Sequence, residues 1–68
     1  MNPDAFNMSI RSFLKMVGVH SQREIEAAVE RAMKSGALKG SESLPAKMRL
    51  TIGGVDLDVS FDGKITLE

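Results

Sequence analysis

The sequence predicts an α+β fold, in which two N-terminal amphipathic helices pack on one face of a three-stranded antiparallel β-meander (ααβββ). Two observations lead to this prediction. Apolar residues recur at helical spacing up to Met33 and alternate with polar residues from Lys47 onward. Glycines stand where the chain has to change direction. With 68 residues, the chain is expected to form a single α+β domain, 1–68.

The first predicted helix begins after Asn2, a favourable N-cap residue, with Pro3 at its first position and Asp4 near the positive end of its dipole. Gly18 is expected to end it. Met8 falls on the side opposite the apolar residues at 100° per residue and is expected to be exposed. The apolar residues are Phe6, Ile10, Phe13, Leu14 and Val17.

The second predicted helix begins at Ser21, which has the spacing of a capping box with Glu24. Its apolar side is rich in alanine, which favours close approach to another helix or to a sheet. Lys34 and Gly36 supply the positive charge and the left-handed stop that are typical of a helix C-terminus. The apolar residues are Ile25, Ala28, Val29, Ala32 and Met33.

A loop is expected from Ala37 to Pro45, because small and polar residues interrupt any period there. Alternation with a period of two follows, which is typical of half-buried strands. The apolar residues of this pattern are Met48, Leu50 and Ile52 before Gly53-Gly54, and Val55, Leu57, Val59 and Phe61 after it.

The two turns are restricted because paired residues of antiparallel strands point to the same face. A two-residue turn at Gly53-Gly54 meets this condition and places Arg49 opposite Asp58. For the second turn, a three-residue loop over 61–63 with Gly63 as a left-handed bulge meets it. The second strand is then central, between two edge strands.

Composition excludes several classes of protein. No cysteine is present, which removes disulfides, thiolate metal sites and cysteine nucleophiles. The N-terminus lacks the pattern of a signal peptide, and no segment is long enough to cross a membrane. Nine basic and nine acidic residues cancel, so no global field concentrates nucleic acid or anionic lipid. We expect a bacterial, cytoplasmic protein without membrane contact.

The segment from Phe13 to Ile25 is similar to the core of a helix-turn-helix, which makes nucleic-acid binding the alternative functional hypothesis. Two features oppose it: His20 adds a residue to the usual turn, and no third helix is available. In addition, the second helix exposes carboxylates that would repel phosphates. Nucleic acid is therefore not the expected partner.

Candidate catalytic groups are few. Asp56 and Asp58 lie about 7 Å apart along one strand, a separation that suits a hydrated cation or acid–base work. In the predicted register they instead face Thr51 and Arg49, so exposed cross-strand pairing is the favoured role. His20 is the only histidine and cannot build a transition-metal site alone. We expect no catalytic, metal or cofactor site, and no enzyme.

A small non-enzymatic protein-interaction module or homodimer is the leading hypothesis, because a core this small leaves stability marginal. The edge strands offer unpaired backbone groups to an added strand, although Lys47 and Arg49 could equally be gatekeepers that prevent such pairing. Met8 is an isolated exposed side chain that suits soft contacts. The candidate partner contacts are Met8, Lys47, Arg49 and Thr51. The expected partner is a second copy or another protein.

Three stretches carry a resemblance to a known family: Asp4–Met8, Gly18–Glu26, and Leu44–Met48 running into Leu50–Gly54. Over the whole chain they resemble a family of short bacterial proteins known only as a domain of unknown function. The resemblance implies a stand-alone protein of about this length, and no activity, ligand or catalytic residue.

Overall fold

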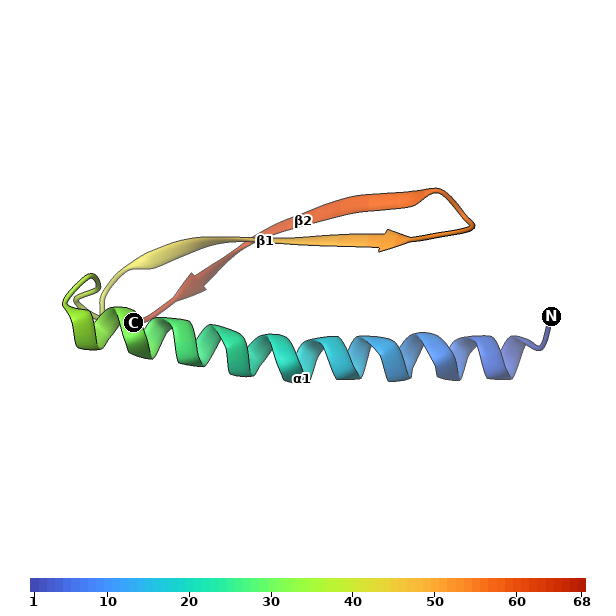
Figure 1. Cartoon of the computed structure of the whole chain (residues 1–68), viewed down its shortest axis with the longest axis horizontal. Coiled ribbons are helices and arrows are strands. Elements are labelled where there is room, and N and C mark those ends of the chain that lie inside the picture. The colour runs from blue at the N-terminus through green and yellow to red at the C-terminus, as the bar shows by residue number, and fades with distance from the viewer. The chain divides into compact units, whose positions relative to one another are not determined.

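The computed structural model describes residues 1–68 and contains one long helix and one β-hairpin (Figure 1). The structure is α+β, but the predicted ααβββ architecture is wrong, because there is one helix instead of two and two strands instead of three. The chain divides into a helical unit, Met1–Ala37, and a hairpin unit, Leu38–Glu68. The elements are α1 (Pro3–Ser35), β1 (Ser43–Ile52) and β2 (Leu57–Thr66).

Both ends of α1 are fixed by local capping, as predicted. The Asn2 side-chain oxygen Oδ1 accepts hydrogen bonds from the backbone N–H groups of Asp4 at 3.0 Å and Ala5 at 3.1 Å. At the other end, Gly36 adopts a left-handed conformation with φ 83°, and its N–H donates to the Met33 carbonyl at 3.2 Å. These two residues set the length of the helix.

The interior of α1 runs unbroken through residues 18–21, where we predicted a turn. A glycine inside a helix costs only about 1 kcal/mol relative to alanine, which is too little to end a helix whose apolar side continues in phase. Ser21 lies four residues from both Val17 and Ile25, so it joins the two predicted apolar sides into one. This joined surface, the α1 stripe, consists of Phe6, Ile10, Leu14, Val17, Ser21, Ile25, Ala28 and Ala32.

The continuous helix overturns two smaller predictions. Ser21 and Glu24 form no capping box, since both lie in the middle of α1. His20 likewise belongs to the helix and not to a turn between helices.

β1 and β2 form one antiparallel ribbon of ten residue pairs. The predicted second turn, residues 61–63, does not exist, because β2 continues through it and pairs with Ser43–Lys47, part of which we expected to be a loop. Gly63 stands opposite Ala46 inside the ribbon and does not have the positive φ of a left-handed bulge. Pro45 is tolerated because both strands of a two-stranded sheet are edges.

The one turn of the hairpin has four residues, 53–56, instead of the predicted two. Ile52 and Leu57 close it as a directly opposed pair. Within the turn, Gly54 has φ 90° and Asp56 has φ 51°. Glycine and aspartate are residues that adopt such left-handed conformations at low cost. The longer turn shifts the predicted register by two residues.

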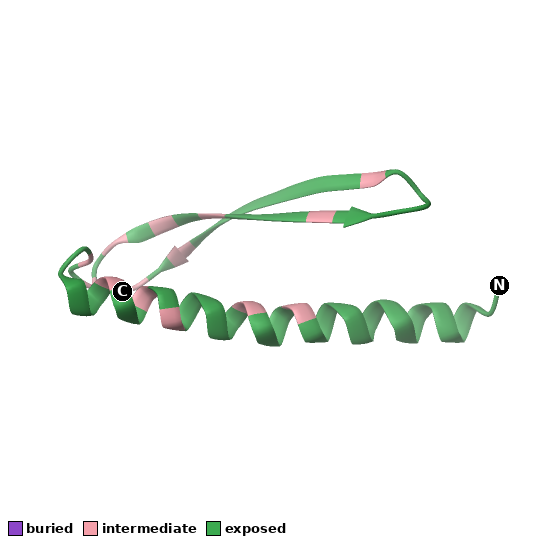
Figure 2. Ribbon diagram, viewed as in Figure 1, coloured by how far each residue is buried: buried purple, intermediate pink, exposed green.

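No residue of the chain is buried (Figure 2). Leu50, Leu57 and Ile65 are half-buried on one face of the ribbon, as the alternation predicts, together with Leu44 and Ala46, and none of them reaches full burial. Neither unit has a closed hydrophobic core, because a single helix and a two-stranded ribbon each bury little surface on their own. The apolar surfaces of both units are therefore the candidate functional surfaces.

Candidate interaction surfaces

One face of the hairpin is apolar along its whole length. The register places apolar residues opposite each other at every second pair, for example Met48 opposite Phe61. Met48 is 45% exposed and Phe61 58% exposed. This surface, the hairpin face, consists of Leu44, Ala46, Met48, Leu50 and Ile52 on β1 and Leu57, Val59, Phe61, Gly63 and Ile65 on β2.

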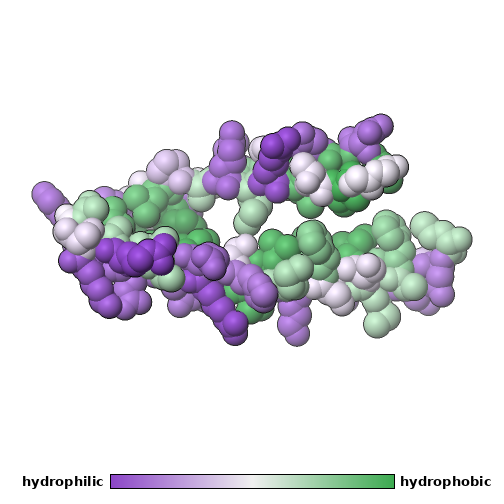
Figure 3. All heavy atoms as spheres, viewed as in Figure 1, coloured by the Kyte–Doolittle hydropathy of each residue, from purple (hydrophilic) through white to green (hydrophobic).

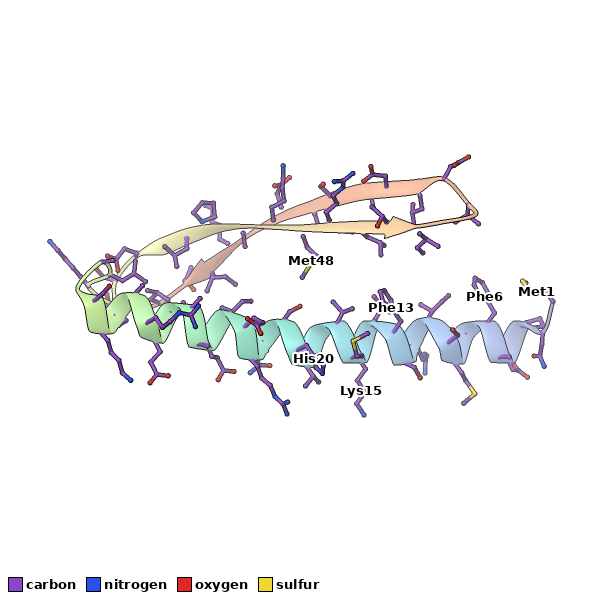
Figure 4. The ribbon with its side chains drawn as sticks, in the orientation of Figure 1. Met1, Phe6, Phe13, Lys15, His20 and Met48 are labelled. Atoms are coloured by element: carbon purple, nitrogen blue, oxygen red, sulfur yellow. The ribbon has the colours of Figure 1, made fainter.

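The α1 stripe is the second apolar surface. Phe6 and Phe13 project from the same side of the helix, and Lys15 projects from the opposite side (Figure 4). Phe6 is 53% exposed and Phe13, at the border of the stripe, is 45% exposed. Figure 3 shows hydrophobic side chains gathered along the N-terminal half of α1. Met8, predicted to lie outside this surface, is 68% exposed.

The other face of the hairpin is polar and carries three of the four predicted contact residues: Lys47, Arg49 and Thr51. Lys47 stands opposite Asp62, which places opposite charges side by side across the ribbon. Met8 belongs to the helical unit. The structure thus gathers Lys47, Arg49 and Thr51 on one face, and their use in binding stays a prediction.

Arg49 is engaged within the chain. Its Nε and Nη2 donate hydrogen bonds to the two carboxylate oxygens of Asp58 at 2.9 and 2.8 Å. These hydrogen bonds lower the pKa of the Asp58 carboxyl and raise the pKa of the Arg49 guanidinium. The predicted pairing of these residues is confirmed, but the predicted register is wrong, since Arg49 stands opposite Ser60 and Asp58 opposite Thr51.

The loop between the two units is organised by Glu42, which sequence reasoning missed. Its carboxylate accepts hydrogen bonds from the backbone N–H groups of Lys39, Gly40 and Ser41 at 2.9 to 3.2 Å. The hydrogen bond from Lys39 contributes most to lowering the pKa of Glu42. The signal available in the sequence is a carboxylate directly after a Lys-Gly-Ser turn, whose N–H groups lack partners.

Asp56 lies in the hairpin turn and Asp58 in β2, where it binds Arg49, so the two carboxylates do not share a strand. No group of three or more histidine, cysteine, aspartate or glutamate side chains is placed to hold a metal ion. The one helix, α1, does not combine the length and the apolar character needed to span a membrane.

The helix-turn-helix hypothesis loses its structural basis. It requires a turn after Gly18, and α1 is helical from Pro3 to Ser35. A straight helix cannot place one segment across a duplex and the next in its groove.

Comparison with known proteins supports the resemblance seen in the sequence. The model of a family described as "Family of unknown function (DUF6494)" matches residues 1–68. No curated protein and no solved structure matches the chain. The predicted family is therefore confirmed, and it brings no activity with it.

Proposed function

The chain belongs to the DUF6494 family, a family of unknown function, and on the evidence of its two apolar surfaces we propose that it is a small non-enzymatic module that acts by binding protein. The partner is either a second copy of the chain or a different protein. The α1 stripe and the hairpin face are the contact surfaces in this proposal.

One observation carries the proposal: no residue is buried, although 43% of the residues are hydrophobic. An isolated helix is marginally stable in water, and so is an isolated two-stranded hairpin. Covering apolar surface contributes about 25 cal/mol per Å². Contact with another polypeptide is therefore the most direct source of stability for both units.

Charge and composition are compatible with this role. The formal net charge is zero, so copies of the chain do not repel each other. Met8, Lys47, Arg49 and Thr51 remain proposed contacts, Arg49 through whichever of its donors Asp58 leaves free. A bacterial cytoplasmic location is part of the same proposal, because the chain contains no cysteine for disulfides.

The test is thermal unfolding of the purified chain, followed by circular dichroism from low to high micromolar concentration, with the mass measured by analytical ultracentrifugation. If association supplies the stability, the unfolding midpoint rises with concentration as the larger species forms. If the chain is instead a monomer that unfolds without cooperativity and binds a dye specific for apolar surfaces, the result supports a different protein as the partner.

A third outcome contradicts the proposal. A strict monomer with a cooperative, concentration-independent transition and no dye binding would show that the chain closes its own apolar surfaces and needs no partner.

A further inference from the structure

Resting on the proposed function, we propose that the occupant of the α1 stripe is a second copy of this chain, bound antiparallel so that the two α1 helices overlap over their full length. Full overlap of two Pro3–Ser35 helices places residue i of one copy beside residue 38 − i of the other. This relation decides which side chains meet.

Side-chain size favours the antiparallel arrangement. The N-terminal half of the α1 stripe is large and the C-terminal half is small. Full overlap sets Phe6 beside Ala32 of the second copy and Ile10 beside Ala28. Large side chains facing small ones fill the space between two helices without voids or overpacking.

The parallel alternative packs poorly. It would set Phe6 against Phe6 and Ile10 against Ile10 at one end, and Ala28 against Ala28 and Ala32 against Ala32 at the other. The first end would be overpacked, and the second would leave voids, each of which is destabilising.

The hairpin of the same chain is too short to cover the whole stripe. A helix of 33 residues is about 50 Å long, whereas strands of ten residues extend about 34 Å. The strands are therefore about three helical turns shorter than α1, and the stripe carries large residues such as Phe6, Ile10 and Leu14 at its N-terminal end.

The contact has the size that a stable dimer needs. A band about 50 Å long and about 10–12 Å wide covers roughly 550 Å² in projection. The two partners together then bury about 1,100 Å², which reaches the roughly 1,000 Å² in total that a specific interface needs.

The natural chain has no cysteine, so engineered single cysteines report the pairing directly. Ile10→Cys and Ala28→Cys are prepared separately, mixed, equilibrated and mildly oxidised, and the disulfide-linked species are resolved by mass spectrometry. Full antiparallel overlap predicts about tenfold more mixed disulfide than either homotypic one, because the interface holds these two thiols at high effective concentration. Lys15→Cys, on the side opposite Phe13 in Figure 4, is the matched control and should give no such excess with Ala28→Cys.

A second pair, Phe6→Cys with Ala32→Cys, keeps the test valid if Ile10→Cys weakens the helix, and circular dichroism verifies that each variant is helical. Homotypic disulfides in excess would show a parallel pair and overturn the proposed geometry, while association itself, and with it the proposed function, would stand. A helical monomer that forms no cross-links would overturn the proposal that a second copy of the chain covers the α1 stripe. The unfolding and dye-binding measurements then decide the proposed function independently.

Discussion

Arg49 and Asp58 form a bidentate ion pair across the hairpin without being directly opposite each other. The Arg49 side chain reaches diagonally from its own pair with Ser60 to the residue that stands opposite Thr51. Diagonal neighbours lie about 7–8 Å apart, which is within the reach of an arginine. The ion pair therefore links two successive residue pairs of the polar face and opposes slippage of the strands.

Asp58→Asn should lower the stability of the hairpin slightly at neutral pH, and the difference from the natural chain should vanish in acid. The pKa of Asp58 is lower in the folded chain than in the unfolded one, because the folded carboxylate accepts hydrogen bonds from Arg49. Its contribution is present above the unfolded pKa and is lost as the pH falls through the folded pKa. Urea unfolding as a function of pH measures this.

Arg49→Gln is the control for that prediction. In its background, Asp58→Asn should have little further effect, because the partner is already absent. An equal loss with and without Arg49 would show that the hydrogen bonds do not carry the effect.

The hairpin shows which part of the fold an alternating pattern can predict. The faces are right for residues 47–52 and 57–61, because the period of two fixes which side chains lie together, whereas Val55 and Asp56, predicted to belong to a strand, lie in the turn. The register is wrong by two residues, since such a shift returns every side chain to its original face and leaves the pattern unchanged. The number of strands is wrong for a related reason. A turn at Gly63 and a continuous strand through Gly63 both keep paired apolar residues on the same face, so the alternating pattern does not distinguish them.

Gly63→Ala should stabilise the chain by about 0.4–1 kcal/mol, because it restricts the unfolded state at a position that alanine can adopt. The backbone at Gly63 lacks a positive φ, and an added Cβ meets no atom within 4 Å. Gly54→Ala is the matched control and should cost about 1–2 kcal/mol, since Gly54 has φ 90°. Denaturant unfolding compares them. A loss at Gly63 similar to that at Gly54 would indicate the left-handed bulge of a three-stranded meander.

In the helix, local signals predict the two ends correctly but predict a break in the middle that does not exist. Asn2 and Gly36 predict both ends correctly, because capping depends on residues within one turn. The supposed break at Gly18 is wrong, because glycine followed by Ser-x-x-Glu looks locally like a helix end and a new capping box. The correct signal is the spacing from Val17 through Ser21 to Ile25, which a turn would have put out of phase.

Gly18→Ala should stabilise α1 by about 1 kcal/mol, because Gly18 lies inside the helix, where alanine is the better residue. Nothing lies within 4 Å of an added Cβ, so no steric cost offsets the gain. Gly36→Ala, at the left-handed cap, should instead cost about 1 kcal/mol. The two variants are compared by the helical circular dichroism signal and by denaturant midpoint, and destabilisation by both would restore the two-helix reading.

The candidate surfaces were predicted in part. Alternation and helical spacing identify which side chains form the apolar faces, and they place Met8 outside them. The role of Glu42 was missed because it depends on backbone N–H groups, whose direction follows from the loop conformation and not from any side-chain pattern.

Glu42→Gln should loosen the loop between the two units at neutral pH, and its effect should fade in acid. The backbone N–H groups of Lys39 and Gly40 hold the pKa of Glu42 below its ordinary value of 4.5. The carboxylate therefore stabilises the folded loop above the unfolded pKa, and this stabilisation is lost as the pH falls through the lower folded pKa. Amide hydrogen exchange at Lys39, Gly40 and Ser41 reports the change locally, with faster exchange expected in the variant.

Glu68→Gln makes the same chemical change at the exposed C-terminal residue and should leave these amides unaffected. Equal exchange rates in Glu42→Gln and the natural chain at neutral pH would show that the carboxylate does not organise this loop.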